Sequence, residues 1–148
     1  MLKKTITYTD YNDMERTEDF YFNLSTAEIM EMQLTTPDGY AGYMQNIVNA
    51  QNNQLLIKIM KDLIIQAYGE KTLDGKQFVK VGPSGNKLST DFVQTEAFSK
   101  MFMELATDSD AASSFVMGIM PKDLQEKVAT LEKEKLITAT GNPPVVVQ

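Results

Sequence analysis

The clearest change of pattern in the sequence lies at residues 19–28, which read DFYFNLSTAE. Phe20, Phe22 and Leu24 alternate with other residues, an arrangement that is typical of a strand with one apolar face. The next four residues, STAE at 25–28, match a capping box. In this motif the serine hydroxyl and the glutamate carboxylate each accept a hydrogen bond from the other residue's backbone N–H. The stretch therefore predicts a strand that is followed at once by a helix.

A second alternating segment opens the chain. Leu2, Ile6 and Tyr8 fall on one face of the predicted strand, and lysine and threonine residues occupy the other. Two such strands, separated by a polar stretch, predict an antiparallel β-hairpin over residues 2–24. The loop between them is too long for a tight two-residue turn. Because an isolated hairpin is only marginally stable in water, its apolar face must pack against helices.

Apolar residues at helical spacing predict the rest of the body. The expected helices cover residues 26–35, 39–51, 54–68, 90–106 and 109–120. Pro37 ends the first of them and Gly69 closes the third, while Ser89 or Thr90 caps the fourth and Asp108 the fifth. Residues 70–88 are rich in turn-forming residues and read as a loop with one short β-prone run at 77–81.

These elements predict a single α+β domain at residues 1–121. An N-terminal β-hairpin packs on a mostly α-helical body of about five to six helices, a number that includes the C-terminal one. The ten methionines are interpreted mainly as flexible filling for the core, because Met30, Met44, Met60 and Met101 fall on predicted apolar faces.

Pro121 predicts the start of a further amphipathic helix at residues 122–135, followed by a flexible tail at 136–148. The apolar positions of this helix form one narrow stripe, at Leu124, Val128 and Leu131. Their spacing of four and then three residues suits a seam against another helix. The sequence leaves open whether that helix belongs to the same domain or to a partner. The three residues are therefore the candidate partner-binding site.

The charge and composition argue against several classes of protein. The formal net charge of the 148 residues is -6, which disfavours binding to a phosphate backbone. The chain has no apolar run long enough for a transmembrane helix, and its polar opening residues do not resemble a signal peptide. We therefore expect a soluble intracellular protein that binds neither nucleic acid nor membrane.

The sequence also lacks the usual equipment for catalysis. The chain has no histidine and no cysteine. It therefore lacks the commonest zinc ligands, and it lacks the histidine base that nucleophilic triads use. Residues 108–119 begin like a calcium-binding loop, but Ser113 and Ile119 replace its required glycine and glutamate. The glycines at Gly69 and Gly75 have the wrong spacing for a phosphate loop. We expect no catalytic residue, no cofactor and no metal.

Several segments go further and indicate a family. They are KKTITYTDY at 3–11, ERTEDFYFNL at 15–24, AYGEK at 67–71, QTEAF at 94–98 and FMELATD at 102–108. In this order, over about residues 2–121, the sequence resembles the tail assembly chaperones of long-tailed phages of Gram-positive bacteria. None of the segments is a chemical motif, so the resemblance rests on their collinear order.

The resemblance implies a non-enzymatic protein that binds the phage tape measure protein and keeps its long helices soluble. Such chaperones also assist tail-tube assembly, which makes the tail-tube protein a second expected partner, and self-association is a further expectation. They act in the host bacterial cytoplasm and are absent from the mature virion. The chain would correspond to the short form of such a chaperone. Two alternatives stay open: a structural virion component, such as a neck or tail-completion protein, and a small inhibitor of a host enzyme.

Overall fold

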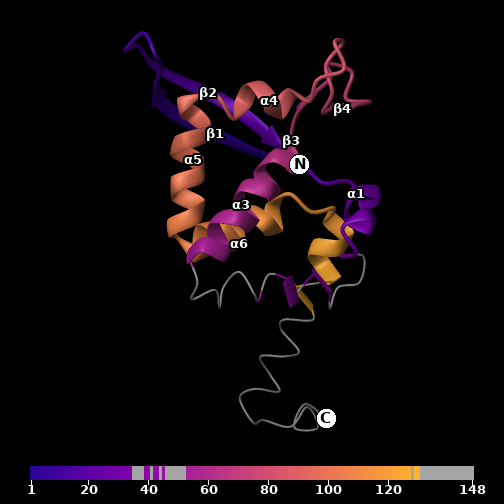
Figure 1. Ribbon diagram of the computed structural model, residues 1–148. Coiled ribbons are helices and arrows are strands. Elements are labelled where there is room, and N and C mark those ends of the chain that lie inside the picture. The colour runs from indigo at the N-terminus through magenta and orange to yellow at the C-terminus, as the bar shows by residue number, and fades with distance from the viewer. Residues whose placement is uncertain (35–38, 41, 44, 46–52, 128, 131–148) are drawn as a thin grey trace, which may run out of the picture.

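The computed structural model describes residues 1–34, 39–40, 42–43, 45, 53–127 and 129–130. It has the predicted α+β architecture, with an N-terminal hairpin and a mainly helical body (Figure 1). The described strands form one antiparallel sheet in the order β1-β2-β3-β4. In Figure 1, α5 lies beside the hairpin and α1 lies on the opposite side of the molecule.

The predicted hairpin is confirmed. Strand β1, Leu2–Thr9, pairs along its whole length with β2, Glu15–Phe22. The second strand starts earlier than the apolar alternation suggested, because polar cross-strand pairs extend the ladder toward the loop. The Thr5 hydroxyl donates to the Asp19 carboxylate at 2.6 Å. A five-residue loop remains, at residues 10–14, bounded by the pair Thr9↔Glu15.

The capping box forms as predicted and starts helix α1, Thr26–Glu31. This helix is shorter than the predicted 26–35, since Gln33 takes a positive φ of 61° that ends the helical path. Of the predicted helix 39–51, the described residues 39, 40, 42, 43 and 45 are helical, and the others lie outside the described residues. There the buried Tyr40 hydroxyl donates to the Val116 carbonyl oxygen.

Helix α3, Asn53–Ala67, confirms the predicted helix at 54–68, but the prediction that Gly69 closes it is wrong. Gly69 lies inside strand β3, Tyr68–Lys71, which pairs with β2 through Tyr21↔Gly69. The predicted loop at 70–88 therefore contributes to the sheet. Strand β4, Phe78–Val79, falls within the β-prone run and pairs with β3.

The predicted helix at 90–106 is two helices, α4 at Leu88–Phe92 and α5 at Glu96–Thr107. The break arises because the Thr95 side chain caps α5 by accepting from the Phe98 N–H at 3.2 Å. The predicted caps Ser89 and Thr90 are wrong, since both residues lie inside α4. Helix α6, Ser109–Gly118, is capped by Asp108 as predicted, in agreement with the prediction for 109–120.

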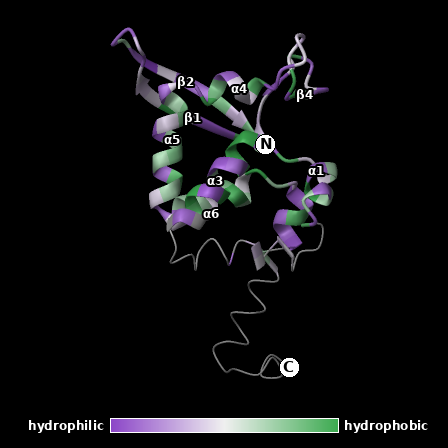
Figure 2. Ribbon diagram, viewed as in Figure 1, coloured by the Kyte–Doolittle hydropathy of each residue, from purple (hydrophilic) through white to green (hydrophobic). Residues whose placement is uncertain are grey.

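Aromatic rings join the sheet to the helices. Phe22 is fully buried, and its ring meets those of Tyr68, Phe92 and Phe115 edge to face, with centroids 5.4–5.9 Å apart. Hydrophobic residues gather where α3, α6 and the strands meet (Figure 2). The prediction that Met30 fills the core is wrong, because its side chain is 64% exposed. Within the described part of the chain, no helix has both the length and the apolar character that are needed to cross a bilayer.

Candidate functional site

A cleft of about 470 Å³ lies between α1, the C-terminal end of α3 and the segment that follows β4. Its apolar walls come from these three elements and from β3, and the residues concerned are Met32, Ile65, Tyr68 and Val81. Ser89 at the start of α4 also lines the cleft and is buried. The volume falls in the lower part of the range that is usual for ligand pockets.

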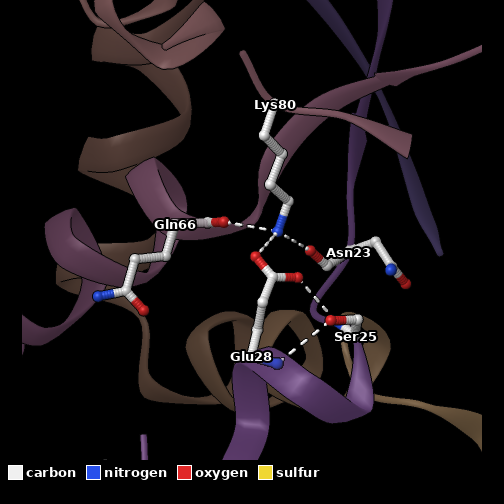
Figure 3. A network of polar contacts seen from close by, with 5 residues as sticks. All are labelled: Asn23, Ser25, Glu28, Gln66 and Lys80. Carbon is white, nitrogen blue, oxygen red and sulfur yellow. Dashed lines mark hydrogen bonds and ion pairs between the residues drawn. The ribbon is translucent and has the colours of Figure 1, made fainter. Parts of the chain in front are cut away.

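Lys80 occupies the centre of a polar network in this cleft (Figure 3). Its Nζ donates to the Asn23 carbonyl oxygen at 2.7 Å and to the Gln66 carbonyl oxygen at 2.8 Å. It also forms an ion pair with the Glu28 carboxylate, whose other oxygen accepts from the Ser25 N–H at 2.9 Å. Three contacts satisfy the three ammonium protons. Lys80 therefore ties α1, the end of α3 and the segment after β2 to one point.

The environment of Glu28 acts on its carboxyl in two directions. Partial burial acts to raise the pKa of Glu28, whereas the hydrogen bonds from Lys80 and Ser25 act to lower it. The hydrogen bonds prevail, so the pKa of Glu28 lies below its usual range. The carboxyl is consequently ionised at neutral pH and remains the partner of Lys80.

The rim of the cleft carries two further charges, on Glu31 and Lys87. Both side chains are exposed, and among the described residues neither forms an ion pair. The described residues contain no group of three or more acidic side chains that could hold a metal ion. The cleft thus offers apolar walls together with one acid and one base that form no ion pair among the described residues.

Comparison with known proteins assigns the chain. The sequence profile of a family described as phage tail assembly chaperone matches residues 1–143. The chain belongs to this family. The searches of curated proteins and of solved structures returned no match. The match confirms the resemblance and extends it beyond residue 121, into the predicted C-terminal helix.

The structure places one of the three predicted partner-binding residues of this tail assembly chaperone. Leu124 is 7% exposed and belongs to the hydrophobic core. Residues 122–127, 129 and 130 are helical, in agreement with the start of the predicted helix at 122–135. Val128 and Leu131 lie outside the residues whose side chains the structure describes, as does the predicted tail at 136–148. Their part in partner binding stays a prediction.

Sequence reasoning missed the central role of Lys80 in the chaperone's cleft. Lys80 and Glu28 are 52 positions apart, and no local pattern links residues at that separation. The sequence did identify Glu28, but only as a helix cap. The one signal was that Lys80 lies between two valines in the β-prone run at 77–81. In a strand its side chain would lie on the face opposite to theirs.

Proposed function

We propose that this tail assembly chaperone binds the phage tape measure protein, keeps its long helices soluble and assists tail-tube assembly. The observation that carries the proposal is the family match, which spans residues 1–143. A role in tail assembly follows from membership of the family, and the tape measure protein is the partner that the resemblance implied. The same membership favours a non-enzymatic role.

The exposed methionines support a role in binding apolar helices. Met14, Met30 and Met103 are 62%, 64% and 56% exposed. Methionine is unbranched and polarisable, so such side chains adapt to partner surfaces of different shape.

The C-terminal helix is the second part of the proposed binding surface. Leu124 anchors its first turn in the core, and we assign the partner contact to Val128 and Leu131. Each aliphatic side chain that is buried against a partner contributes roughly 1.5–3 kcal/mol before the costs of ordering. Two of them support a weak and reversible contact, as an assembly factor that must leave requires.

The proposal includes the setting of the protein. The chaperone acts in the host bacterial cytoplasm, has the tail-tube protein as a further partner, can self-associate, and is left out of the mature virion. A structural virion component or a host-enzyme inhibitor is the alternative. Detection of the chain in purified virions favours the first alternative, and co-purification with a host enzyme favours the second.

The experiment is co-expression of the tagged chaperone with the tape measure protein of the same phage, followed by a pull-down. The double substitution Val128→Asp with Leu131→Asp should reduce capture strongly. The matched control, Ala129→Asp with Thr130→Asp, places the same charges at two exposed positions of the helix and should leave capture unchanged. Absence of the tape measure protein from the wild-type pull-down refutes the proposed function. Equal capture by both variants refutes the role of Val128 and Leu131 alone.

A further inference from the structure

Three large hydrophobic side chains are exposed on the hairpin loop and on the neighbouring helix α5. Tyr11 and Met14 belong to the loop at residues 10–14 and are 76% and 62% exposed, and Met103 on α5 is 56% exposed. Figure 1 shows this loop at the end of the hairpin that lies away from α1. We call Tyr11, Met14 and Met103, together with Glu15 and Glu96 beside them, the hairpin–α5 surface.

The loop that carries Tyr11 and Met14 is held in one shape by Asp10. The Asp10 Oδ1 accepts from the Asn12 N–H at 2.8 Å and from the Met14 N–H at 3.0 Å. Its Oδ2 accepts from the Arg16 guanidinium, and its N–H donates to the Met14 carbonyl oxygen at 2.8 Å. A loop that is already ordered loses little conformational entropy when it binds. The backbone that carries Tyr11 and Met14 is therefore ordered before a partner binds.

A shallow cavity of about 390 Å³ connects the two sides of this surface. It lies between the end of the hairpin and α5 and is lined by Thr7, Thr9, Glu15, Glu96, Lys100 and Met103, among others. The Glu96 carboxylate faces the Tyr11 hydroxyl closely enough to raise the pKa of that phenol. The loop and the helix therefore form one continuous surface.

The charges on this surface decide what kind of partner it fits. Glu15 and Glu96 form no ion pair among the described residues. Of the neighbouring cations, Arg16 is neutralised by Asp10, whereas Lys100 donates to the neutral Thr7 carbonyl oxygen and keeps its charge. The two glutamates therefore still exceed the free cation by one negative charge. The surface is thus apolar with an acidic rim. Two copies that met through it would bring their carboxylates together, whereas a basic partner would neutralise them.

We propose that the hairpin–α5 surface binds an amphipathic helix whose apolar face is flanked by lysine or arginine. The inference rests on the proposed function and assigns this helix to the tape measure protein. Methionine and tyrosine side chains contact the apolar face, and the carboxylates of Glu15 and Glu96 contact the flanking cations. The contact is small, which suits a transient complex. It involves none of the residues of the predicted contact at Val128 and Leu131.

The test uses full-length chaperone, co-expressed with the tape measure protein and captured by its tag. The variant Tyr11→Ser/Met14→Ser/Met103→Ser should reduce capture by roughly tenfold or more, since tyrosine is a frequent hot spot of interfaces and methionine is enriched in their cores. The matched control, Ile57→Ser/Leu73→Ser, removes exposed hydrophobic side chains that belong neither to the hairpin–α5 surface nor to the cleft around Lys80, and it should capture as the wild type does. Melting curves confirm that both variants fold.

A second pair of variants tests the charge. Glu15→Gln/Glu96→Gln should lower capture and make the remaining capture less sensitive to added NaCl, because screening acts on the charges that it removes. The control Asp62→Asn/Glu70→Gln changes two exposed acids outside this surface and should retain the salt sensitivity of the wild type. These variants keep the side-chain shape, so they remain informative if the triple variant does not fold.

The outcomes separate this inference from the function on which it rests. If the wild type captures the tape measure protein and the triple variant captures it equally, the hairpin–α5 surface is not the site. A changed sedimentation coefficient of the triple variant alone would assign the surface to self-association and overturn the inference. If the wild type captures no tape measure protein, the proposed function fails, and the inference fails with it.

Discussion

Tyr68 and Phe92 stack face to face, with ring centroids 4.2 Å apart and ring planes 2° from parallel. Tyr68 opens strand β3 directly after α3, and Phe92 ends α4. Partial burial raises the pKa of Tyr68 to about 12, so its ring is neutral at physiological pH. The stack joins β3 to α4, a helix of only five residues. It also completes the aromatic group around Phe22.

Phe22 lies at the centre of this group. Phe22→Ala should lower the free energy of unfolding by about 3–5 kcal/mol, because the loss of the ring leaves a cavity that its neighbours cannot fill. The control Tyr11→Ala removes an aromatic ring that is 76% exposed and should change stability by about 0.5 kcal/mol or less. Urea denaturation measures both. A Phe22→Ala variant as stable as the wild type would show that the aromatic group is not the core.

Lys80 is expected to stabilise the fold through its three contacts. Lys80→Met keeps the aliphatic stem but removes the ammonium group that donates to two carbonyl oxygens and to the Glu28 carboxylate. The expected loss is about 1–3 kcal/mol. Lys87→Met, at the exposed rim of the same cleft, is the control and should be nearly neutral. Equal melting temperatures for the two variants would contradict this interpretation of the network.

Glu28 should make stability depend on acid pH. Its folded-state pKa is lowered, so its contribution is present above the unfolded pKa and is lost as the pH falls through the folded value. The unfolded value for glutamate is about 4.3, which places the loss below about pH 4. Glu28→Gln should therefore lower stability at pH 7 and make little difference in strong acid. Unfolding midpoints measured between pH 7 and 3 test this, and a constant difference across that range would count against it.

Two glycines should respond in opposite directions to the same substitution. A Cβ at Gly69 would lie 2.5 Å from the Phe78 ring and 2.7 Å from the Val79 carbonyl oxygen, so Gly69→Ala should cost about 1–3 kcal/mol. Gly42 is helical, and a Cβ there would meet nothing within 4 Å. Gly42→Ala should stabilise by about 0.5–1 kcal/mol. Differential scanning calorimetry checks both signs.

Local patterns in the sequence predicted the parts of the fold that local forces determine. The alternation of Phe20, Phe22 and Leu24 predicted a strand with one buried face, and the structure buries Phe22 and Leu24 completely or nearly so. The pair Ser25 and Glu28 predicted the start of α1, because a capping box satisfies its own backbone donors within four residues.

The errors arose where distant residues decide the outcome. Gly69 looked like a helix terminator, yet it is a strand residue that pairs with Tyr21. Glycine is needed there because Phe78 and Val79 pass too close for any side chain. Thr95 is an exception, because it breaks the predicted helix at 90–106 through a local cap that starts a second helix. The ion pair of Lys80 with Glu28 and the hairpin–α5 surface depend on tertiary packing, for which a single sequence carries no local signal.

The measurement that tests the central claim most directly is the soluble fraction of the tape measure protein. It is expressed in bacteria alone and with this chaperone, and the protein in the cleared lysate is quantified against the total. We predict a mostly insoluble tape measure protein in the first case and a largely soluble one, in complex with the chaperone, in the second. An unchanged soluble fraction would contradict the claim that the chain acts as the chaperone of the tape measure protein.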